Sequence, residues 1–173
     1  MATRNALDPP RRSDRIFITG ATGTGKSVLA RRLFDANPPP RLVIDPKDDV
    51  DATGGAYRDR RTAITFRTPP APGRPFPPDA SMRFAPRDPD DLDVYDAVIA
   101  AAFNTPGIVL WADEAGTVIP AAGAGRAARR YVTQGRGRGL GLIALHPRPL
   151  EVARAIPANA EHVVAFALYH PDD

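Results

Sequence analysis

The chain has 173 residues, of which 43% are hydrophobic and 25% charged, a composition typical of one soluble globular domain whose net charge of +3 permits a polyanionic partner. The absence of cysteine excludes disulfides and thiolate metal sites, and three histidines argue against a zinc centre. Because the apolar runs fall far short of the ~20 residues of a membrane span and the N-terminus is polar, we expect no membrane anchor, no signal peptide and a cytoplasmic location.

The first predicted elements surround a glycine-rich loop. Residues 1–14 are expected to be a flexible basic arm, residues 15–19 a buried strand and residues 26–36 an amphipathic helix. Between strand and helix, the motif G-x-x-x-x-G-K-[ST] is matched in full by Gly20-Ala21-Thr22-Gly23-Thr24-Gly25-Lys26-Ser27. We predict that a nucleoside triphosphate binds this loop and the start of the helix, from Gly20 to Val28.

The residue types of this loop suit phosphate chemistry. Its glycines let the backbone approach an anion, and N–H groups at the start of the helix would bind the charge. Lys26 and Lys47 are the only lysines among 23 basic residues. A compact ammonium fits among those N–H groups and reaches the β- and γ-phosphates, whereas a planar guanidinium is too wide. Ser27 would place its hydroxyl on Mg²⁺.

The remaining pattern alternates strands with helices. The proline-rich segment 68–89 is expected to be a surface excursion or a mobile loop, with a short edge strand around Met82-Arg83-Phe84. The other expected strands are 41–45, 63–67, 107–112, 140–145 and 162–168, and the other expected helices are 92–104, 121–134 and 149–156. This alternation predicts an α/β fold, with a mostly parallel sheet and helices on both faces, in a single domain over residues 15–173.

One apolar strand ends in two adjacent carboxylates, Asp113 and Glu114, which is the pattern of a Walker B segment with a catalytic glutamate. Asp113, directly at the strand end, would hold Mg²⁺ through water, and Glu114 would orient and deprotonate the attacking water. The alternative is that the pair merely caps the next helix. Together with the phosphate-binding loop, the pair favours hydrolysis over binding alone.

Arginines gather between Gly125 and Ala155, where Glu151 is the only acid. The basic residues of this stretch are Arg126, Arg129, Arg130, Arg136, Arg138, Arg148 and Arg154. They would contact nucleic-acid phosphates and supply an arginine finger to a neighbouring subunit. The alternative is a solvated helix face followed by a basic loop.

Taken together, these motifs resemble the FtsK–HerA superfamily of DNA-pumping ATPases, which includes the genome-packaging ATPases of tailless, membrane-containing viruses. The resemblance rests on the phosphate-binding loop, the Asp113-Glu114 pair and the turn in Val43-Ile44-Asp45-Pro46-Lys47. It extends to Arg136-Gly137-Arg138-Gly139, Arg148-Pro149 and Ile156-Pro157-Ala158-Asn159-Ala160. It implies a RecA-like (ASCE) P-loop NTPase fold that uses ATP and Mg²⁺.

The resemblance also implies roles for single residues. Arg136 would be the arginine finger that acts across a subunit interface, with Arg138 as the competing candidate. Where the family commonly has Thr-Gln at the end of the strand after Walker B, this chain has His146-Pro147. His146 is therefore a candidate γ-phosphate sensor or a strand-end histidine with a structural role. Lys47 would anchor its loop or contact DNA, or would simply be solvated.

The function implied by the resemblance is ATP-driven translocation of double-stranded DNA, without reading its sequence, to package a viral genome into a capsid. The expected partners are the DNA, further copies of the chain in a hexameric or pentameric ring, and a capsid portal vertex. The expected location is the host cytoplasm or the virion. Two alternatives are a small-molecule P-loop kinase, which would need no oligomer, and a non-catalytic nucleotide-gated assembly factor.

Overall fold

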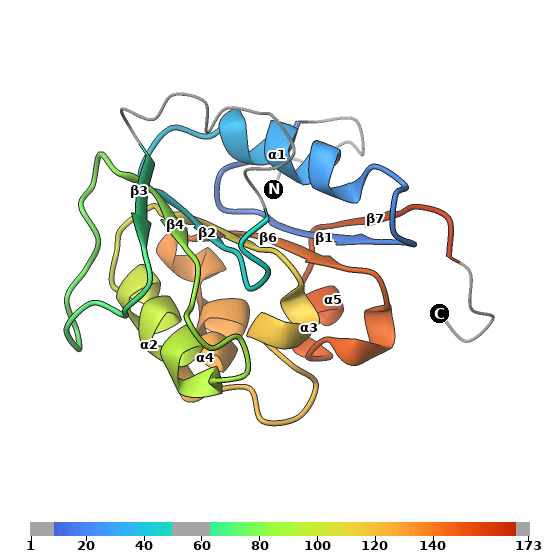
Figure 1. The fold of residues 1–173 in the computed structure, drawn as a ribbon. Helices are drawn as coiled ribbons and strands as arrows, with labels where there is room; N and C mark the ends of the chain where they lie inside the picture. Colours follow the sequence, from blue (N-terminus) through green and yellow to red (C-terminus); the bar gives the residue numbers. More distant parts are fainter. Residues whose placement is uncertain (1–8, 50–62, 169–173) are drawn as a thin grey trace.

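The computed structural model describes residues 9–49 and 63–168. Within these ranges the chain forms a seven-stranded, fully parallel sheet with the order β3-β4-β2-β5-β6-β1-β7 (Figure 1). The strands are β1 Arg15–Thr19, β2 Arg41–Ile44, β3 Ala63–Phe66, β4 Ser81–Phe84, β5 Val109–Ala112, β6 Gly141–His146 and β7 His162–Ala165. The predicted α/β class with a parallel sheet is confirmed.

Helices cover both faces of this sheet, as predicted (Figure 1). Every residue of β1, β5 and β6 is buried, which suits strands that are covered on both sides. One face packs against α1 (Lys26–Asp35), where Phe34 contacts Trp111 of β5 edge to face at a ring-centre distance of 5.6 Å. This contact fixes α1, and the loop that precedes it, over the middle of the sheet.

The other face packs against α2 (Leu92–Phe103), α4 (Arg126–Gln134) and the short helices α3 (Ala115–Val118) and α5 (Ala155–Ala158). α2 begins where Asp91 accepts a hydrogen bond of 3.0 Å from the backbone N–H of Asp93, as is usual at a helix start. Among residues 9–49 and 63–168, no helix is both long and apolar enough to cross a lipid bilayer.

The strand predicted around Met82 is present, but it is not an edge strand. β4 lies between β2 and β3, and β3 forms the edge of the sheet. The position is possible because Arg83 of β4, although buried, makes a 2.7 Å ion pair with Asp45 after β2. The prolines that made segment 68–89 resemble an edge lie outside β4, and the one charge within the strand is neutralised by a residue far away in the sequence.

Two predicted helices have different bounds in the structure. The helix expected from residue 121 begins at Arg126, because Gly123 and Gly125 precede it and Gly125 has an extended backbone. The segment 149–156 contains a 3₁₀ turn, Pro149–Glu151, and only the first residues of α5. Val152 separates them in an extended conformation because it pairs with Pro120 in an isolated bridge.

Part of the predicted N-terminal arm lies against the amino edge of the sheet. The side chain of Arg12 donates hydrogen bonds to the backbone oxygens of Gly107 and Pro40. Asp14 is buried and lies 3.1 Å from the ring of His162. Residues 1–8 of the predicted arm lie outside the described ranges.

The loops of interest all follow strands at the opposite, carboxyl edge. The glycine-rich loop follows β1, the Asp45 turn follows β2, Asp113 follows β5 and His146 ends β6. Because these four strands are neighbours in a parallel sheet, their carboxyl ends meet in one crevice, which is where ligands bind in open α/β sheets.

Candidate functional site

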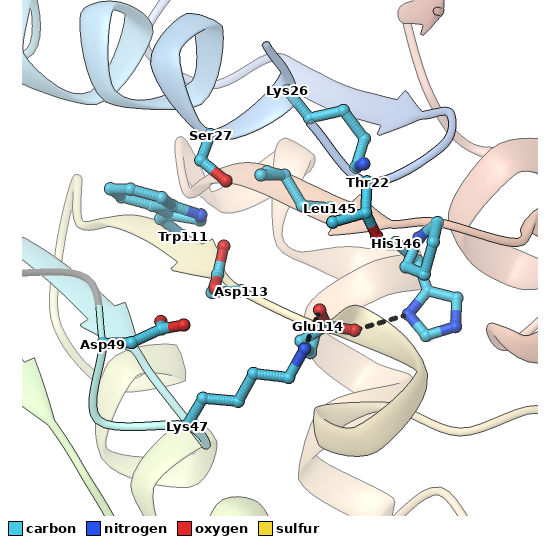
Figure 2. Close-up of a pocket in the computed structure, with 11 residues that line it drawn as sticks. Thr22, Lys26, Ser27, Lys47, Asp49, Trp111, Asp113, Glu114, Leu145 and His146 are labelled. Carbon is cyan, nitrogen blue, oxygen red and sulfur yellow. Dashed lines mark hydrogen bonds and ion pairs between the residues drawn. The ribbon is translucent and has the colours of Figure 1, made fainter. Parts of the chain in front are cut away.

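A pocket opens at the carboxyl edge of the sheet, below the start of α1 and beside the ends of β5 and β6 (Figure 2). Most of its lining side chains are polar or charged. They are Thr22, Lys26, Ser27, Lys47, Asp49, Trp111, Asp113, Glu114, Leu145, His146 and Pro147. The structure thus brings residues of the glycine-rich loop, the carboxylate pair and the strand-end histidine around one cavity.

Backbone geometry in the glycine-rich loop depends on its glycines. Gly20 has φ 140°, and a Cβ atom there would lie 2.6 Å from Cβ of Phe166, so a larger residue would collide with the segment after β7. Gly25, directly before α1, has φ 100°. Because the first amide groups of a helix have no partner within it, the turn at Gly25 leaves those of α1 available to an anion.

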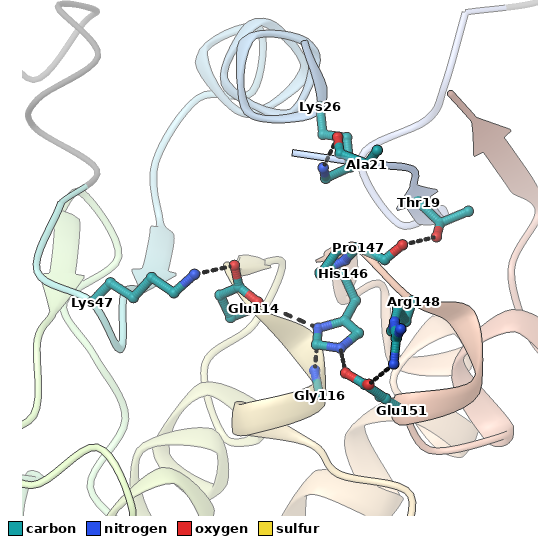
Figure 3. Close-up of polar contacts among 10 residues, drawn as sticks. All are labelled: Thr19, Ala21, Lys26, Lys47, Glu114, Gly116, His146, Pro147, Arg148 and Glu151. Atoms are coloured by element: carbon teal, nitrogen blue, oxygen red, sulfur yellow. Dashed lines mark hydrogen bonds and ion pairs between the residues drawn. The ribbon is translucent and has the colours of Figure 1, made fainter. Parts of the chain in front are cut away.

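Lys26 is folded back onto its own loop. Its Nζ atom donates a hydrogen bond of 2.7 Å to the backbone oxygen of Ala21 (Figure 3). Burial lowers the pKa of Lys26, although the charges of Glu114 and Asp113 act in the opposite direction. A phosphate oxygen would be a stronger partner for this ammonium than a neutral carbonyl, so the loop suits an anionic ligand.

Asp113 lies in an excess of negative charge. Burial raises the pKa of its carboxyl group to about 7, and the charges of Asp45, Glu114 and Asp49 contribute further. Carboxylate oxygens of Asp45, Asp49 and Asp113 lie within 4.8 Å of one another. A bound cation would relieve the repulsion within this group.

The oxygen atoms in this region are suitable ligands for Mg²⁺. Asp45 is already engaged, because Arg83 lies 2.7 Å from its Oδ2 atom. Asp113 and Asp49 line the pocket together with Ser27. Carboxylate and hydroxyl oxygens are ligands that Mg²⁺ accepts, directly or through water, so these residues could hold the ion beside the phosphates of a nucleotide.

Glu114 has an unusual backbone and two charged or polar neighbours. Its φ of 54° places it in the left-handed region, which non-glycine residues seldom occupy and which is enriched at functional sites. Its Oε1 atom lies 2.6 Å from Nζ of Lys47, and this contact raises the pKa of Lys47 (Figure 3). Its Oε2 atom lies 3.5 Å from Nδ1 of His146.

His146 is buried and uses both ring nitrogens within the chain (Figure 3). Nδ1 accepts a hydrogen bond of 3.1 Å from the backbone N–H of Gly116, and Nε2 lies 2.9 Å from Oε2 of Glu151. This pattern assigns the proton of a neutral ring to Nε2, which donates to Glu151. The contact lowers the pKa of Glu151, to which Arg148 also bonds at 3.3 Å.

No protein-family model and no curated protein matches the sequence. Solved structures do match. The genome packaging NTPase B204 from Sulfolobus turreted icosahedral virus 2, in complex with sulfate, has a TM-score of 0.67 and 16% identity, covering 94% of this chain and 78% of B204. This chain has a P-loop NTPase fold.

Two further structures share the P-loop NTPase fold of this chain. B204 in complex with ATP-gammaS has a TM-score of 0.67 and 15% identity over 94% of this chain and 79% of B204. The N-terminal domain of zonular occludens toxin from Neisseria meningitidis has a TM-score of 0.51 and 16% identity, over 89% of this chain and 76% of that domain.

In this P-loop NTPase fold, the two candidate finger residues lie far from the pocket. The 3₁₀ turn Arg136–Arg138 precedes β6, at the amino edge of the sheet, whereas the pocket lies at the carboxyl edge. Arg136 is exposed and makes a 2.9 Å ion pair with Glu161. The guanidinium of Arg138 lies 4.4 Å from the ring centre of Phe103.

Trp111 and Asp49 line the pocket but are absent from the site predicted from the sequence. Trp111 lies near the end of β5, and Asp113, two positions later, directly follows the strand, so the two-residue spacing that puts side chains on one face of a strand is a usable signal. Asp49 comes from the turn after β2. Its approach to Asp113 depends on the pairing of β2 with β5, which the sequence pattern does not reveal.

Proposed function

We propose that this chain is a Mg²⁺-dependent ATPase that moves double-stranded DNA as a ring of identical subunits, in the packaging of a viral genome through a portal vertex. The observation that carries the proposal is the convergence of the glycine-rich loop, Asp113 and Glu114 on one pocket. Further support comes from the fold, which is similar to that of a viral genome packaging NTPase solved in complex with nucleotide analogues.

Residues 20–28 would hold the phosphates of ATP. The backbone N–H groups at the start of α1 would donate to the phosphate oxygens, and Lys26 would exchange the backbone oxygen of Ala21 for the β- and γ-phosphates. Ser27 and Asp113 would hold Mg²⁺, which when bound neutralises phosphate charge. Asp49 would add a further acceptor for the water molecules around it.

Glu114 would orient the attacking water and accept its proton. In the structure its Oε1 atom is engaged by Lys47, so one oxygen of the base is already occupied by a cation. His146 touches the other side of Glu114 but has both nitrogens committed to Gly116 and Glu151. It would therefore position Glu114 through contact and reach a γ-phosphate only if one of those bonds opened.

Arg136 would act as the finger on the ATP of a neighbouring subunit. It lies at the opposite edge of the sheet from its own pocket, and its head group is exposed. Arg138 is the less suitable candidate because its guanidinium lies over Phe103. The other arginines between 126 and 154 would contact DNA phosphates, which position a duplex without reading its sequence.

Steady-state ATP hydrolysis tests the proposal when measured with Mg²⁺ over a range of protein concentrations, with and without long double-stranded DNA. We expect turnover that rises more steeply than linearly with protein and rises again with DNA. Lys26→Ala should abolish it by weakening nucleotide binding, whereas Glu114→Gln should abolish turnover and keep the nucleotide bound.

Each alternative gives a different result in the same assay. Turnover that is linear in protein concentration and unchanged by DNA, with phosphate transferred to an added small-molecule acceptor, would show that the chain is a kinase and not a DNA motor. Nucleotide binding without turnover under every condition would leave a nucleotide-gated assembly factor.

A further inference from the structure

The single tryptophan of the chain, Trp111, lies at the edge of the pocket. Trp111 is 1% exposed, and among the described residues its indole Nε1 is buried with no hydrogen-bond partner. The same residue lines the cavity together with Ser27 and Asp113. Buried donors almost always have a partner, so one left open at a ligand cavity points to an acceptor that the ligand brings.

The indole ring is held in place and cannot turn away to find an acceptor elsewhere. It lies on the α1 side of the sheet, where Phe34 contacts it edge to face at 5.6 Å. In the sheet, Trp111 pairs with Val43 of β2 and Ile143 of β6, and both are buried. The nitrogen-bearing edge of the ring lies on the side of Ser27 and Asp113, toward the cavity (Figure 2).

The chemistry of the indole N–H restricts its partner. It donates and cannot accept, so its partner must be an oxygen with a free lone pair. A water molecule bound to Mg²⁺ directs a lone pair at the metal and donates its hydrogens to its surroundings, which makes it a poor acceptor. Oxygens of a phosphate chain are anionic, have several lone pairs and form stronger hydrogen bonds than neutral acceptors.

We propose that Trp111 is a nucleotide-contacting residue, whose indole N–H donates to an oxygen of the bound phosphate chain. This inference rests on the proposed function, because it requires a nucleotide in the pocket. Trp111 would add a hydrogen-bond donor from the centre of the sheet to those of the glycine-rich loop. It lies on β5, the strand that Asp113 directly follows. The contact would couple the position of the phosphates to β5.

Because the chain has one tryptophan, a ¹⁵N-tryptophan label gives a single indole N–H resonance that reports on this bond directly. We expect the proton to move downfield on addition of Mg²⁺ with AMPPCP, and not with Mg²⁺ alone. A shift of equal size with Mg²⁺ alone would overturn the inference, because the acceptor would then be a reoriented side chain such as Asp113.

Nucleotide affinity gives the second readout. Trp111→Phe keeps an aromatic ring against Phe34 and removes the donor together with one ring of the indole, so calorimetry should show about tenfold weaker binding of Mg²⁺–AMPPCP. Phe34→Leu is the matched control: it alters packing against the same ring, keeps the indole donor and should change the affinity less than about twofold.

The outcomes separate this inference from the proposed function. Absence of nucleotide binding to the unaltered chain would overturn both. Normal binding, with an unmoved indole resonance and equal affinity in Trp111→Phe, would overturn the contact alone and leave the ATPase proposal standing. Equal losses of affinity in Trp111→Phe and Phe34→Leu would likewise reduce Trp111 to a packing residue.

Discussion

In the free protein, burial and the neighbouring carboxylates raise the pKa of Asp113 to about 7 from an ordinary value of 3.8. Between these two values the folded chain binds a proton at Asp113 that the unfolded chain has released. The bound proton stabilises the folded chain, and this stabilisation is lost as the pH rises toward 7. Mg²⁺ requires the ionised carboxylate and has the opposite dependence. We therefore expect Mg²⁺-dependent nucleotide affinity to increase between about pH 6 and about pH 8.

Calorimetry in two buffers of different ionisation enthalpy measures this effect, because it counts the protons released on binding. About half a proton should be released near the pKa and almost none at about one unit or more above it. Asp113→Asn serves as the control and should bind weakly with no dependence on pH. An affinity of the unaltered chain that stays constant over this range would contradict the role of Asp113 in holding the metal.

Gly116 determines whether His146 can keep its place. A Cβ atom at Gly116 would lie 2.5 Å from Cε1 of His146, so Gly116→Ala must displace the ring and break the bond to Nδ1. We expect a loss of about 1–3 kcal/mol in the free energy of unfolding, and lower turnover because His146 also contacts Glu114. Urea unfolding and ATP hydrolysis measure the two effects.

The matched control for this substitution is Gly137→Ala. A Cβ atom at Gly137 meets nothing within 4 Å, so its stability should change by less than about 0.5 kcal/mol. Equal stability of the two alanine variants would show that the ring of His146 moves without cost.

At the scale of elements, β4 is held in the sheet by a buried ion pair. Arg83 and the carboxylate of Asp45 are 6% and 0% exposed, and they connect β4 to the turn after β2. Arg83→Met would leave the buried carboxylate of Asp45 without its Arg83 partner and beside Asp113, so we expect a loss of about 3–5 kcal/mol in the free energy of unfolding.

The double variant Asp45→Leu with Arg83→Met separates the charge from the packing. It removes both members of the buried pair, so it should lose less stability than Arg83→Met alone. Urea unfolding of the three proteins measures the comparison. A double variant less stable than the single one would show that shape, and not the uncompensated charge, dominates at this position.

The elements that the sequence predicts well are those whose signals are local. β1, α1 and β5 follow from apolar runs next to the glycine-rich loop and next to Asp113, and these same motifs indicate most of the pocket. Interior placement of β4 depends on Asp45, a partner outside its own segment. The start of α4 at Arg126 could have been predicted, because the glycines before it are a local signal against helix. The contact of Lys47 with Glu114 arises only when β2 pairs with β5.

On the scale of the whole molecule, the proposed active site is divided between two edges of the sheet. Arg136 precedes β6 and the pocket lies beyond its carboxyl end, and the 6 residues of this strand span about 20 Å at ~3.3 Å per residue. A side chain cannot bridge that length. A finger role for Arg136 therefore requires a head-to-tail contact in which the amino edge of one subunit meets the carboxyl edge of the next, as in a closed ring.

Mixing two inactive variants tests this arrangement. Lys26→Ala disables its own nucleotide site and keeps Arg136, whereas Arg136→Ala keeps its nucleotide site and lacks the finger, at a cost of about 10³-fold or more in turnover. In rings assembled at random from equal amounts of the two variants, about a quarter of the sites combine an intact pocket with an intact finger from the neighbour. ATP hydrolysis should therefore recover to roughly a quarter of the unaltered rate, if sites act independently.

The control mixture combines Lys26→Ala with Glu114→Gln. Both variants keep Arg136 and each lacks a residue that acts within its own pocket, so no arrangement of neighbours restores a complete site. Recovery in this control would mean that a subunit supplies its neighbour with a catalytic residue other than Arg136. A different result would identify Arg138 as the finger: no recovery in the first mixture, but recovery when Arg138→Ala replaces Arg136→Ala. In that case the guanidinium of Arg138 would have to leave the ring of Phe103 at the subunit contact.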